Sequence, residues 1–317
     1  MGNSNFPTLT KIKEASQRIR PFIHKTPVLK STAIDKLAGC RVFFKCENFQ
    51  KVGAFKARGA SNAVLKLQDS IKQKGVATHS SGNHAAALAK AASQAGIPSF
   101  IVMPTSAPTV KIDAVKEYGG EITFCEPTLE ARERTLMQVV EETGASFIPP
   151  YDHWDIIEGQ ATCALEFLEE IPSLESIMAP VGGGGLLAGT ALSASYLSST
   201  IKVYGAEPLG ADDAFKSFKA GKRIPMTNPK TIADGLLTSL GERNFSVIME
   251  LVEDILTVED KAIVTAMRLI YERLKIVVEP SCAVPLAALL ANKEMFLGQE
   301  VGIILSGGNV DLTKLPF

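Results

Sequence analysis

Four consecutive glycines, residues 182–185, form the clearest chemical motif of the sequence. They follow an apolar run typical of a buried strand, Ser176 to Val181, and precede a stretch rich in alanine and leucine. Because glycine has no Cβ, its N–H group is accessible to a ligand, and N–H groups at a helix start attract anions. The run is neither a Walker loop, since no Gly-Lys-Ser/Thr follows, nor a clean GxGxxG motif. A flexible turn is the alternative, but the position favours a cradle for the phosphate of a small ligand.

Lys56 is the candidate nucleophile. It lies in the segment Gly53-Ala54-Phe55-Lys56-Ala57-Arg58-Gly59-Ala60, and its own neighbours are small or apolar. Such surroundings penalise the charged form of an amine and lower its pKa, and a neutral amine can attack a carbonyl to form a Schiff base. Most lysines are solvated surface residues, so its neighbours, rather than its type, single out Lys56.

Two clusters of small polar residues follow strand-like runs. Ser80-Ser81-Gly82-Asn83-His84 follows residues 76–78 and precedes a helix-like stretch, and Ser306-Gly307-Gly308-Asn309 follows residues 301–305. Hydroxyls, an amide and free N–H groups at a helix start suit an anion such as a carboxylate. The carboxyl ends of parallel strands are where α/β sheets bind ligands. An ordinary helix cap and an ordinary β-turn are the alternatives for the two clusters.

The elements that must position these clusters alternate between strands and helices. Short apolar runs recur without interruption, as in strands buried on both faces, and between them lie stretches with an apolar face at helical spacing. This alternation predicts an α/β fold with a parallel sheet between helices. The expected strands are residues 42–44, 76–78, 100–103, 122–124, 177–179, 203–205 and 301–305, and the expected helices are residues 9–19, 85–95, 129–143 and 156–170.

The length of 317 residues suits two domains. No linker rich in proline, glycine or serine marks a boundary, so we expect the chain to cross between the domains more than once. The segment 75–150 contains its own strand–helix units and is expected to form a small inserted domain. Residues 1–74 and 151–317 would then form the large domain.

Charge and composition exclude several classes of partner. The chain has 33 basic and 34 acidic side chains, a balance that gives no electrostatic reason to expect a nucleic acid or an anionic membrane. The longest apolar run, residues 282–291, has about half the length of a spanning helix. Residues 1–7 lack the basic and apolar segments of a secretory signal and a strong myristoylation pattern. We therefore expect a cytoplasmic protein.

The cysteines and histidines predict neither a disulfide framework nor a zinc site. The five cysteines are scattered without a CxxC pair, and the four histidines never approach zinc-ligand spacing. We expect reduced thiols that are mostly buried.

Taken together, the four motifs resemble the fold-type II family of pyridoxal-phosphate enzymes, and within it the group of serine racemases and serine/threonine dehydratases. The likeness covers nearly the whole chain, and Glu207-Pro208 with Ala211-Asp212-Asp213 follows the pattern of the racemases. It implies two parallel-type α/β domains, as in the β subunit of tryptophan synthase, with the cofactor in the cleft between them, and a homodimer. The matching segments are Thr26-Pro27-Val28-Leu29, Lys45-Cys46-Glu47-Asn48-Phe49-Gln50, Phe55-Lys56 and Ser306-Gly307-Gly308-Asn309-Val310-Asp311.

The resemblance implies a role for each site residue. Lys56, next to Phe55, would hold the aldehyde of pyridoxal phosphate, and Ser81 would face Lys56 across the cofactor plane. Asn83 would hydrogen-bond the ring 3′ oxygen, and Ser306 the pyridine nitrogen. The cofactor phosphate would lie against Gly182, Gly183, Gly184 and Gly185, and the substrate carboxylate against Ser80, Ser81, Gly82, Asn83 and His84.

These residue types constrain the reaction. A serine hydroxyl stabilises a pyridinium less than an aspartate carboxylate would, so the ring is a weaker electron sink. A β-hydroxy substrate can then escape by expelling its hydroxyl, whereas inversion at Cα needs one base on each face, which Lys56 and Ser81 could supply. We expect racemisation of serine together with elimination of serine or threonine to the 2-oxoacid and ammonia.

A metal site is expected at Glu207 and Asp213 with the backbone carbonyl of Ala211. Two carboxylates and a carbonyl suit a hard cation such as Mg²⁺, Ca²⁺ or Mn²⁺. Alone, the pair would be typical of a solvated loop; the resemblance favours the metal.

Two stretches depart from the family's pattern. Ala85 stands where many relatives have glycine, which would narrow the space beside the substrate. Residues 149–153 differ from the vertebrate racemases and are closer to microbial and plant members, so nucleotide activation stays open.

Arg132 matches a position where the racemases place an arginine near the substrate, although a helix-surface contact with a neighbouring acid is the favoured alternative.

Two other functions compete with the racemase. A 3-hydroxyaspartate ammonia-lyase would need a further cation for the second carboxylate of its substrate. A non-catalytic protein that binds pyridoxal phosphate is disfavoured because Lys56, Ser81 and Ser306 are all present.

Overall fold

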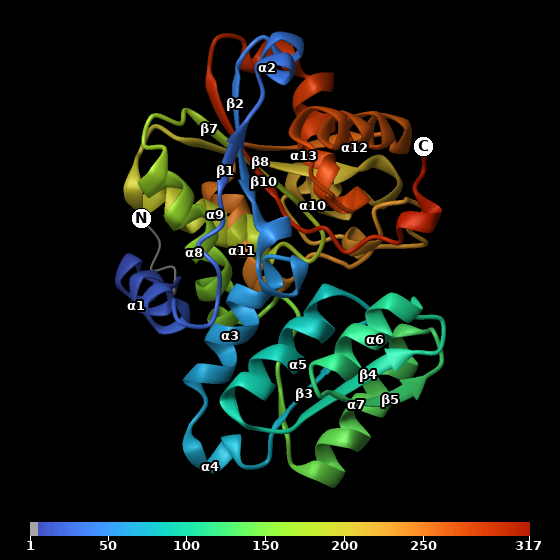
Figure 1. The fold of residues 1–317 in the computed structure, drawn as a ribbon. Coiled ribbons are helices and arrows are strands. Elements are labelled where there is room, and N and C mark those ends of the chain that lie inside the picture. Colours follow the sequence, from blue (N-terminus) through green and yellow to red (C-terminus); the bar gives the residue numbers. More distant parts are fainter. Residues whose placement is uncertain (1–5) are drawn as a thin grey trace.

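The computed structural model describes residues 6–317, which fold into two lobes, each built on its own sheet (Figure 1). We call them the large lobe, around a six-stranded sheet, and the small lobe, around a four-stranded sheet. Residues 1–5, which carry most of the stretch where no secretory signal is expected, lie outside the described residues. Among the described residues, no helix is long and apolar enough to cross a lipid bilayer.

The sheet of the large lobe has the strand order β1-β2-β10-β7-β8-β9. The edge strand β1 pairs with β2 in antiparallel fashion, and the remaining neighbours pair in parallel. Parallel neighbours bring their carboxyl ends to one edge of the sheet, where α/β folds bind ligands. The strands are β1 (Val28–Lys30), β2 (Arg41–Cys46), β7 (Ser176–Pro180), β8 (Lys202–Pro208), β9 (Asp254–Val258) and β10 (Glu300–Leu305).

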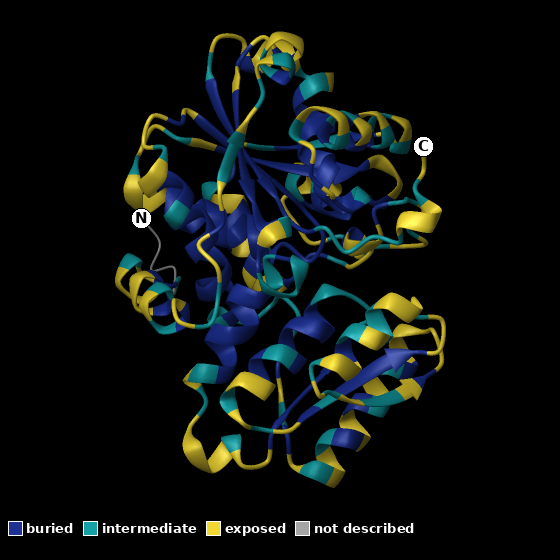
Figure 2. Cartoon of the chain, viewed as in Figure 1, coloured by how far each residue is buried: buried dark blue, intermediate teal, exposed yellow. Residues whose placement is uncertain are grey.

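Helices cover both faces of this sheet, and its strands divide their side chains between two cores. On β10, Val301, Ile303 and Leu305 belong to one core and Ile304 to the other, which explains why the run is apolar throughout. The strands accordingly lie as buried ribbons between the helices (Figure 2). One face carries α2 (Thr32–Ala38), α12 (Asp260–Leu274) and α13 (Pro280–Ala291); the other carries α1 (Leu9–Ile19), α8 (Trp154–Glu170), α9 (Gly185–Leu197) and α11 (Glu242–Leu251). Helix α10 (Asp213–Ala220) packs beside β9 and α11.

The small lobe has a parallel sheet in the order β5-β4-β3-β6. Its strands are β3 (Val76–His79), β4 (Ser99–Pro104), β5 (Glu121–Cys125) and β6 (Ser146–Phe147). Around it lie α3 (Lys56–Lys66), α4 (Asp69–Lys72), α5 (Asn83–Ala95), α6 (Thr109–Glu117) and α7 (Leu129–Thr143). All four strands fall inside the predicted segment 75–150, while α3 packs against both α5 and α8. The division into domains at residues 75 and 150 stays a prediction.

Short 3₁₀ turns complete the chain at η1 (Glu47–Phe49), η2 (Lys51–Gly53), η3 (Leu209–Ala211), η4 (Asp234–Leu236), η5 (Lys293–Phe296) and η6 (Leu312–Lys314). The α/β fold predicted from the sequence is confirmed, and each expected strand overlaps an observed one. The prediction of buried thiols is also confirmed, since the five cysteines are free and buried: Cys40, Cys46, Cys125, Cys163 and Cys282.

Candidate active site

Lys56 is the first residue of α3 and is tied to the carboxyl end of β10. The Phe55 N–H donates to the Ser306 carbonyl (3.0 Å), and the Gly308 N–H donates to the Gly53 carbonyl (2.9 Å). Ser306 itself is buried. Two motifs about 250 residues apart in the sequence, Phe55-Lys56 and Ser306-Gly307-Gly308, therefore form one piece of structure.

The amine of Lys56 is enclosed. Its Nζ donates to the Pro150 carbonyl (2.7 Å) and lies 5.2 Å from the ring centroid of Phe55 and 6.0 Å from that of Tyr151. Burial lowers the pKa of Lys56 to about 8, an effect that the negative charge of Glu279 partly opposes. A substantial fraction of this lysine is therefore neutral and nucleophilic at mildly alkaline pH.

The segment 80–84 connects β3 to the start of α5. The Ser80 hydroxyl accepts the Gly82 N–H (3.3 Å), and α5 begins at Asn83 without an acidic residue in its first turn. Within the described chain the Ser81 hydroxyl has no hydrogen-bond partner, so it is available to a bound molecule. These are the features of an anion site at a helix N-terminus.

His84 is placed differently from the other members of this segment. Its imidazole Nε2 contacts the Ile148 carbonyl (3.2 Å), and burial, reinforced by the positive charge of Lys56, lowers its pKa to about 3. The imidazole is therefore neutral near pH 7 and offers no positive charge to a substrate carboxylate. Its contribution to an anion site is limited to the backbone N–H.

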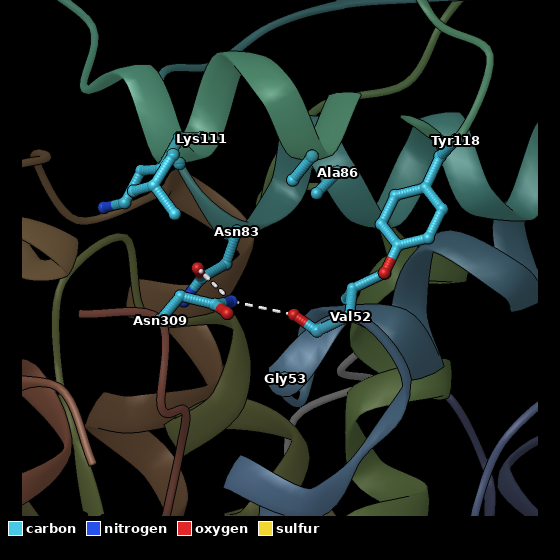
Figure 3. Close-up of a pocket in the computed structure, with 10 residues that line it drawn as sticks. Val52, Gly53, Asn83, Ala86, Lys111, Tyr118 and Asn309 are labelled. Carbon is cyan, nitrogen blue, oxygen red and sulfur yellow. Dashed lines mark hydrogen bonds between the residues drawn. The ribbon is translucent and has the colours of Figure 1, made fainter. Parts of the chain in front are cut away.

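Asn83 belongs to a chain of polar side chains that reaches a buried acid. Its Nδ2 donates to Glu279 Oε1 (2.8 Å), and its Oδ1 accepts from Asn309 Nδ2 (3.0 Å), which also donates to the Val52 carbonyl (2.7 Å; Figure 3). Glu279 is 3% exposed and its Oε2 has no partner. Burial raises the pKa of Glu279 to about 7, and the negative charge of Asp234 adds to the rise.

Sequence reasoning missed Glu279. A signal was present, because it is an acid between the apolar run Ile276-Val277-Val278 and the proline that opens α13. Acids in such positions are rare unless paired.

The glycine loop joins β7 to α9. Gly184 has a positive φ of 90° and caps the helix, and a Cβ on Gly183 would lie 2.3 Å from the ring of Tyr151. Side chains are thus excluded from both positions. Helix α9 has 13 residues and no acid in its first turn. A run of uncovered N–H groups at this helix start fits a phosphate, as the sequence predicts.

The pair Glu207 and Asp213 is buried at the end of β8 and the start of α10. Glu207 accepts the N–H groups of Ala214 (3.1 Å) and Phe215 (2.9 Å), and Asp213 Oδ1 has no partner. Burial raises the pKa of both carboxyls; the negative charge of Asp213 adds to the rise at Glu207, and that of Asp212 adds to the rise at Asp213.

These carboxylates fit a cation. The nearby Lys216 pairs with Asp212, and neither buried carboxylate has an ion pair with a described lysine or arginine. No group of three or more metal-ligating side chains occurs among residues 6–317, so a cation here would use the two carboxylates, the buried Ala211 carbonyl and water.

Arg132, on α7, has an unpaired guanidinium. Its Nε is buried without a hydrogen bond, and the neighbouring acid Glu130 lies 3.8 Å from Arg134 instead. Burial lowers the pKa of His79; the negative charge of Glu133 opposes this shift, and the positive charge of Arg132 adds to it. Because His79 directly precedes Ser80, this cation lies on the side of the small lobe that carries the segment 80–84.

A cavity of about 220 Å³ lies beside this constellation, between the lobes (Figure 3). It shares Gly82 and Asn83 with the anion-binding segment. Its other lining residues include Val52, Gly53, Lys111, Tyr118 and Asn309.

Comparison with known proteins identifies the family. The sequence profile of the family described as pyridoxal-phosphate dependent enzymes matches residues 19–307. The chain belongs to this family. It is 50% identical over 311 residues to the β-hydroxyaspartate dehydratase of Paracoccus denitrificans, a match that covers 98% of this chain and 99% of the relative. It is 50% identical over 309 residues to the serine racemase of Oryza sativa subsp. indica, covering 96% of this chain and 91% of the relative.

The solved structure of maize serine racemase superposes with a TM-score of 0.95 at 48% identity, covering 96% of this chain and 94% of that one. These matches confirm the resemblance and the fold-type II architecture predicted from the sequence. A pyridoxal-phosphate dependent enzyme must hold both the aldehyde and the phosphate of its cofactor. In this chain, Lys56 and the glycine loop are the groups that fit them.

Proposed function

We propose that this pyridoxal-phosphate dependent enzyme is a serine racemase that also eliminates water from L-serine and L-threonine, giving the 2-oxoacid and ammonia. One observation carries the proposal: an enclosed lysine with a lowered pKa lies 6.0 Å from the ring of Tyr151, which packs on the glycine loop, and its charge acts on His84 at the start of α5, where Ser81 has a free hydroxyl. The relatives named serine racemase, from rice and maize, support it.

The cofactor would be held at both ends and along its ring. Lys56 would bind the aldehyde and Phe55 would lie beside it, while Asn83 and Ser306 would hydrogen-bond the ring. The phosphate would lie against Gly182, Gly183, Gly184 and Gly185. When bound, the cofactor withdraws electrons from the substrate Cα and makes its proton acidic.

The residues of the chain then move the protons. The substrate carboxylate binds to the segment 80–84, which fixes the Cα proton relative to Lys56. With the substrate amine in place of Lys56 on the aldehyde, the freed neutral Lys56 amine would take this proton on one face, and the Ser81 hydroxyl would give its proton on the opposite face, which would invert Cα. Departure of the β-hydroxyl with a proton from an acid gives elimination instead. The Ser306 hydroxyl, unlike a carboxylate, leaves the ring a weak electron sink and so favours this exit.

Further features belong to the same proposal. A Mg²⁺ ion, or Ca²⁺ or Mn²⁺, would bind at Glu207, Asp213 and the Ala211 carbonyl. The enzyme would act as a homodimer in the cytoplasm, and activation by a nucleotide stays open.

A second candidate function is a 3-hydroxyaspartate ammonia-lyase. The observation that favours it is the unpaired guanidinium of Arg132 beside His79, since a dicarboxylic substrate needs one more cation than serine does. The relative from Paracoccus denitrificans supports this alternative.

The test is a combined assay of amino-acid chirality and 2-oxoacid formation, with pyridoxal phosphate, Mg²⁺ and L-serine, L-threonine or 3-hydroxyaspartate as substrate. We expect D-serine and pyruvate together from L-serine. Pyruvate without D-serine would contradict the racemase. A much higher kcat/KM for 3-hydroxyaspartate would favour the second candidate.

The variant Ser81→Ala separates the two reactions within this assay. We expect it to reduce racemisation at least about 100-fold, the lower range for loss of a positioned acid or base, and elimination of L-serine far less. Equal losses of both reactions would show that Ser81 has a structural role instead.

A further inference from the structure

We propose that residues 240–244 couple the carboxylate pair Glu207–Asp213 to the glycine loop, so that a divalent cation at the pair and the cofactor phosphate at the loop strengthen each other's binding. Asn244 is the positioning residue of this connection. The inference rests on the two binding sites of the proposed function and adds a thermodynamic link between them.

The connection starts at Asp213. Its Oδ2 accepts the backbone N–H of Leu240 (2.8 Å), while its Oδ1 is buried without a partner. A cation that binds Oδ1 therefore fixes a carboxylate whose other oxygen already holds the backbone at residue 240.

Leu240 in turn packs against the glycine loop. A Cβ on Gly184 would lie 2.5 Å from Leu240 Cδ1 and 2.9 Å from Asn244 Cβ. Gly184 is also the residue with the positive φ at the start of α9. The segment 240–244 thus lies directly against the turn that presents the N–H groups.

The decisive contacts are made to one carbonyl. The Gly183 carbonyl accepts both the Gly241 N–H (3.1 Å) and the Asn244 Nδ2–H (2.6 Å). A trans peptide is planar with its C=O and N–H pointing in opposite directions. Holding the Gly183 carbonyl toward residues 241 and 244 therefore turns the Gly184 N–H away from them, into the cradle.

Asn244 is suited to this task by its surroundings. It is 0% exposed, and its Oδ1 has no hydrogen-bond partner, so the amide is oriented by the two carbonyls to which its Nδ2 donates, Gly183 at 2.6 Å and Tyr151 at 3.4 Å. The start of α11, on which it lies, is fixed by Asp152, whose carboxylate accepts the N–H groups of Glu242 (3.0 Å) and Arg243 (2.9 Å). A shift of Leu240 is thus transmitted to Gly183 rather than absorbed by a loose helix end.

Linkage makes the effect reciprocal: if Mg²⁺ strengthens cofactor binding by some factor, the cofactor strengthens Mg²⁺ binding by the same factor. We expect a factor of at least about five, the lower end of typical couplings. The Kd of pyridoxal phosphate is measured on the wild-type apo protein by the absorbance of the lysine-bound form, with Mg²⁺ or with a chelator. The Kd of Mg²⁺ is measured by calorimetry with and without pyridoxal phosphate.

Pyridoxal, which lacks the phosphate, is the ligand control: its Kd should not respond to Mg²⁺. A response equal to that of pyridoxal phosphate would overturn the route through the glycine loop. If Mg²⁺ and pyridoxal phosphate both bind but neither changes the Kd of the other, the proposed coupling is wrong while the two binding sites stand. If Mg²⁺ or pyridoxal phosphate does not bind at all, the corresponding site of the proposed function is wrong as well.

The variant Asn244→Leu keeps the branched shape of the side chain and removes the donor to the Gly183 carbonyl, together with the longer bond to the Tyr151 carbonyl. We expect Mg²⁺ and pyridoxal phosphate still to bind to this variant, but the factor by which each strengthens the binding of the other should fall to about one. Asn292→Leu is the matched control, since it removes an amide-to-carbonyl bond of 2.9 Å to Ala288, at the end of α13. A coupling that survives Asn244→Leu would overturn the role of Asn244. The wild-type measurements test the coupling even if this variant does not fold.

Discussion

Burial changes the chemistry of two charged side chains in the cleft. Lys56 and Glu279 act on each other electrostatically, yet burial lowers the pKa of the lysine and raises that of the acid. Desolvation therefore outweighs the mutual attraction at both groups. The consequence is a lysine that releases its proton far more readily than lysines in water. Next to it lies an acid that keeps its proton up to about neutral pH.

The pH dependence of cofactor attachment tests the state of Lys56. Only the neutral amine attacks an aldehyde, and a lowered pKa makes this form dominant above pH 8 rather than above about 10.5. We expect the attachment rate of pyridoxal phosphate to the apo protein to rise toward pH 8 and then to flatten, as followed by stopped-flow absorbance. Lysine acetylated on its α-amino group, with the side-chain amine free in solution, is the control. Its attachment rate should continue to rise above pH 8. A protein rate that rises in parallel with this control would contradict an enclosed amine.

The difference between Lys56 and Glu279 shows which residues a sequence can single out. Lys56 has small and apolar neighbours along the chain, so its surroundings are partly visible in the sequence. The environment of Glu279 is made by Asn83 and Gly307, far away in the sequence. Tyr151 and Asn244 were missed for the same reason, because their contacts with the glycine loop exist only in three dimensions.

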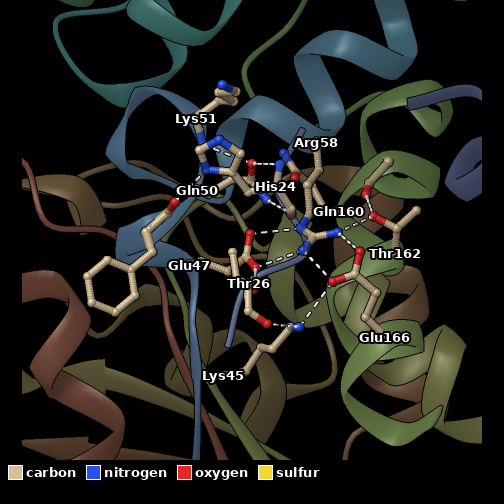
Figure 4. Close-up of polar contacts among 12 residues, drawn as sticks. His24, Thr26, Lys45, Glu47, Gln50, Lys51, Arg58, Gln160, Thr162 and Glu166 are labelled. Atoms are coloured by element: carbon tan, nitrogen blue, oxygen red, sulfur yellow. Dashed lines mark hydrogen bonds and ion pairs between the residues drawn. The ribbon is translucent and has the colours of Figure 1, made fainter. Parts of the chain in front are cut away.

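Among the helices, α3 needs the firmest support, because Lys56 opens it. Arg58, two residues later, is 0% exposed and joins turn η1, which directly follows β2, to α8 (Figure 4). It donates to Glu47 (2.7 and 2.8 Å) and to Glu166 (both 2.9 Å). Lys45 also donates to Glu166 (3.0 Å). This network of two cations and two acids, of which only Glu166 is partly exposed, fixes the start of α3 on the large lobe.

The variant Arg58→Met tests this network. It removes the cation that Glu47 and Glu166 share and leaves the buried Glu47 without its ion pair, so we expect the free energy of unfolding to fall by about 3–5 kcal/mol. Urea denaturation of the apo protein measures it. The control is Lys202→Met, which removes an exposed ion pair with Glu253 and should change stability little. Similar losses in both variants would show that the network does not stabilise the fold.

Predictability also varies among the elements. Strands such as β7 and β10 are visible in the sequence because burial on both faces makes them apolar throughout. Three strands were not predicted: β1 and β6 have three and two residues, and β9 begins with a charged residue and has a mixed burial pattern. Such short or half-buried strands are determined by their neighbours in the sheet more than by their own residues.

Across the whole molecule, the site is shared by the two lobes. The small lobe contributes the segment 80–84, and the large lobe contributes the glycine loop and Ser306. Turn η4 packs on the large lobe next to the glycine loop. The Gly235 N–H donates to Ser281 (2.9 Å), and a Cβ on Gly182 would lie 3.1 Å from Leu236 Cα. Its first residue, Asp234, forms an ion pair with Lys111 of α6 in the small lobe. This pair connects the lobes beside Gly82.

The variant Lys111→Met tests whether this connection keeps the cleft closed. The side chains of Lys111 and Asp234 are 12% and 46% exposed, and an ion pair this accessible contributes up to about 1 kcal/mol. A smaller fraction of closed molecules weakens apparent substrate binding in proportion. We therefore expect KM for L-serine to rise by up to about fivefold with kcat nearly unchanged, because saturating substrate restores closure.

Steady-state kinetics measure this split, with Lys219→Met as the control. That variant removes an ion pair of 2.7 Å with Asp254 that lies entirely within the large lobe, so it should leave both constants unchanged. A fall in kcat at unchanged KM would contradict the closure role, and would instead place the Lys111 ammonium in the chemistry at Gly82. An equal rise of KM in both variants would show that the effect is a general response to lost surface charge and that the ion pair does not hold the lobes together.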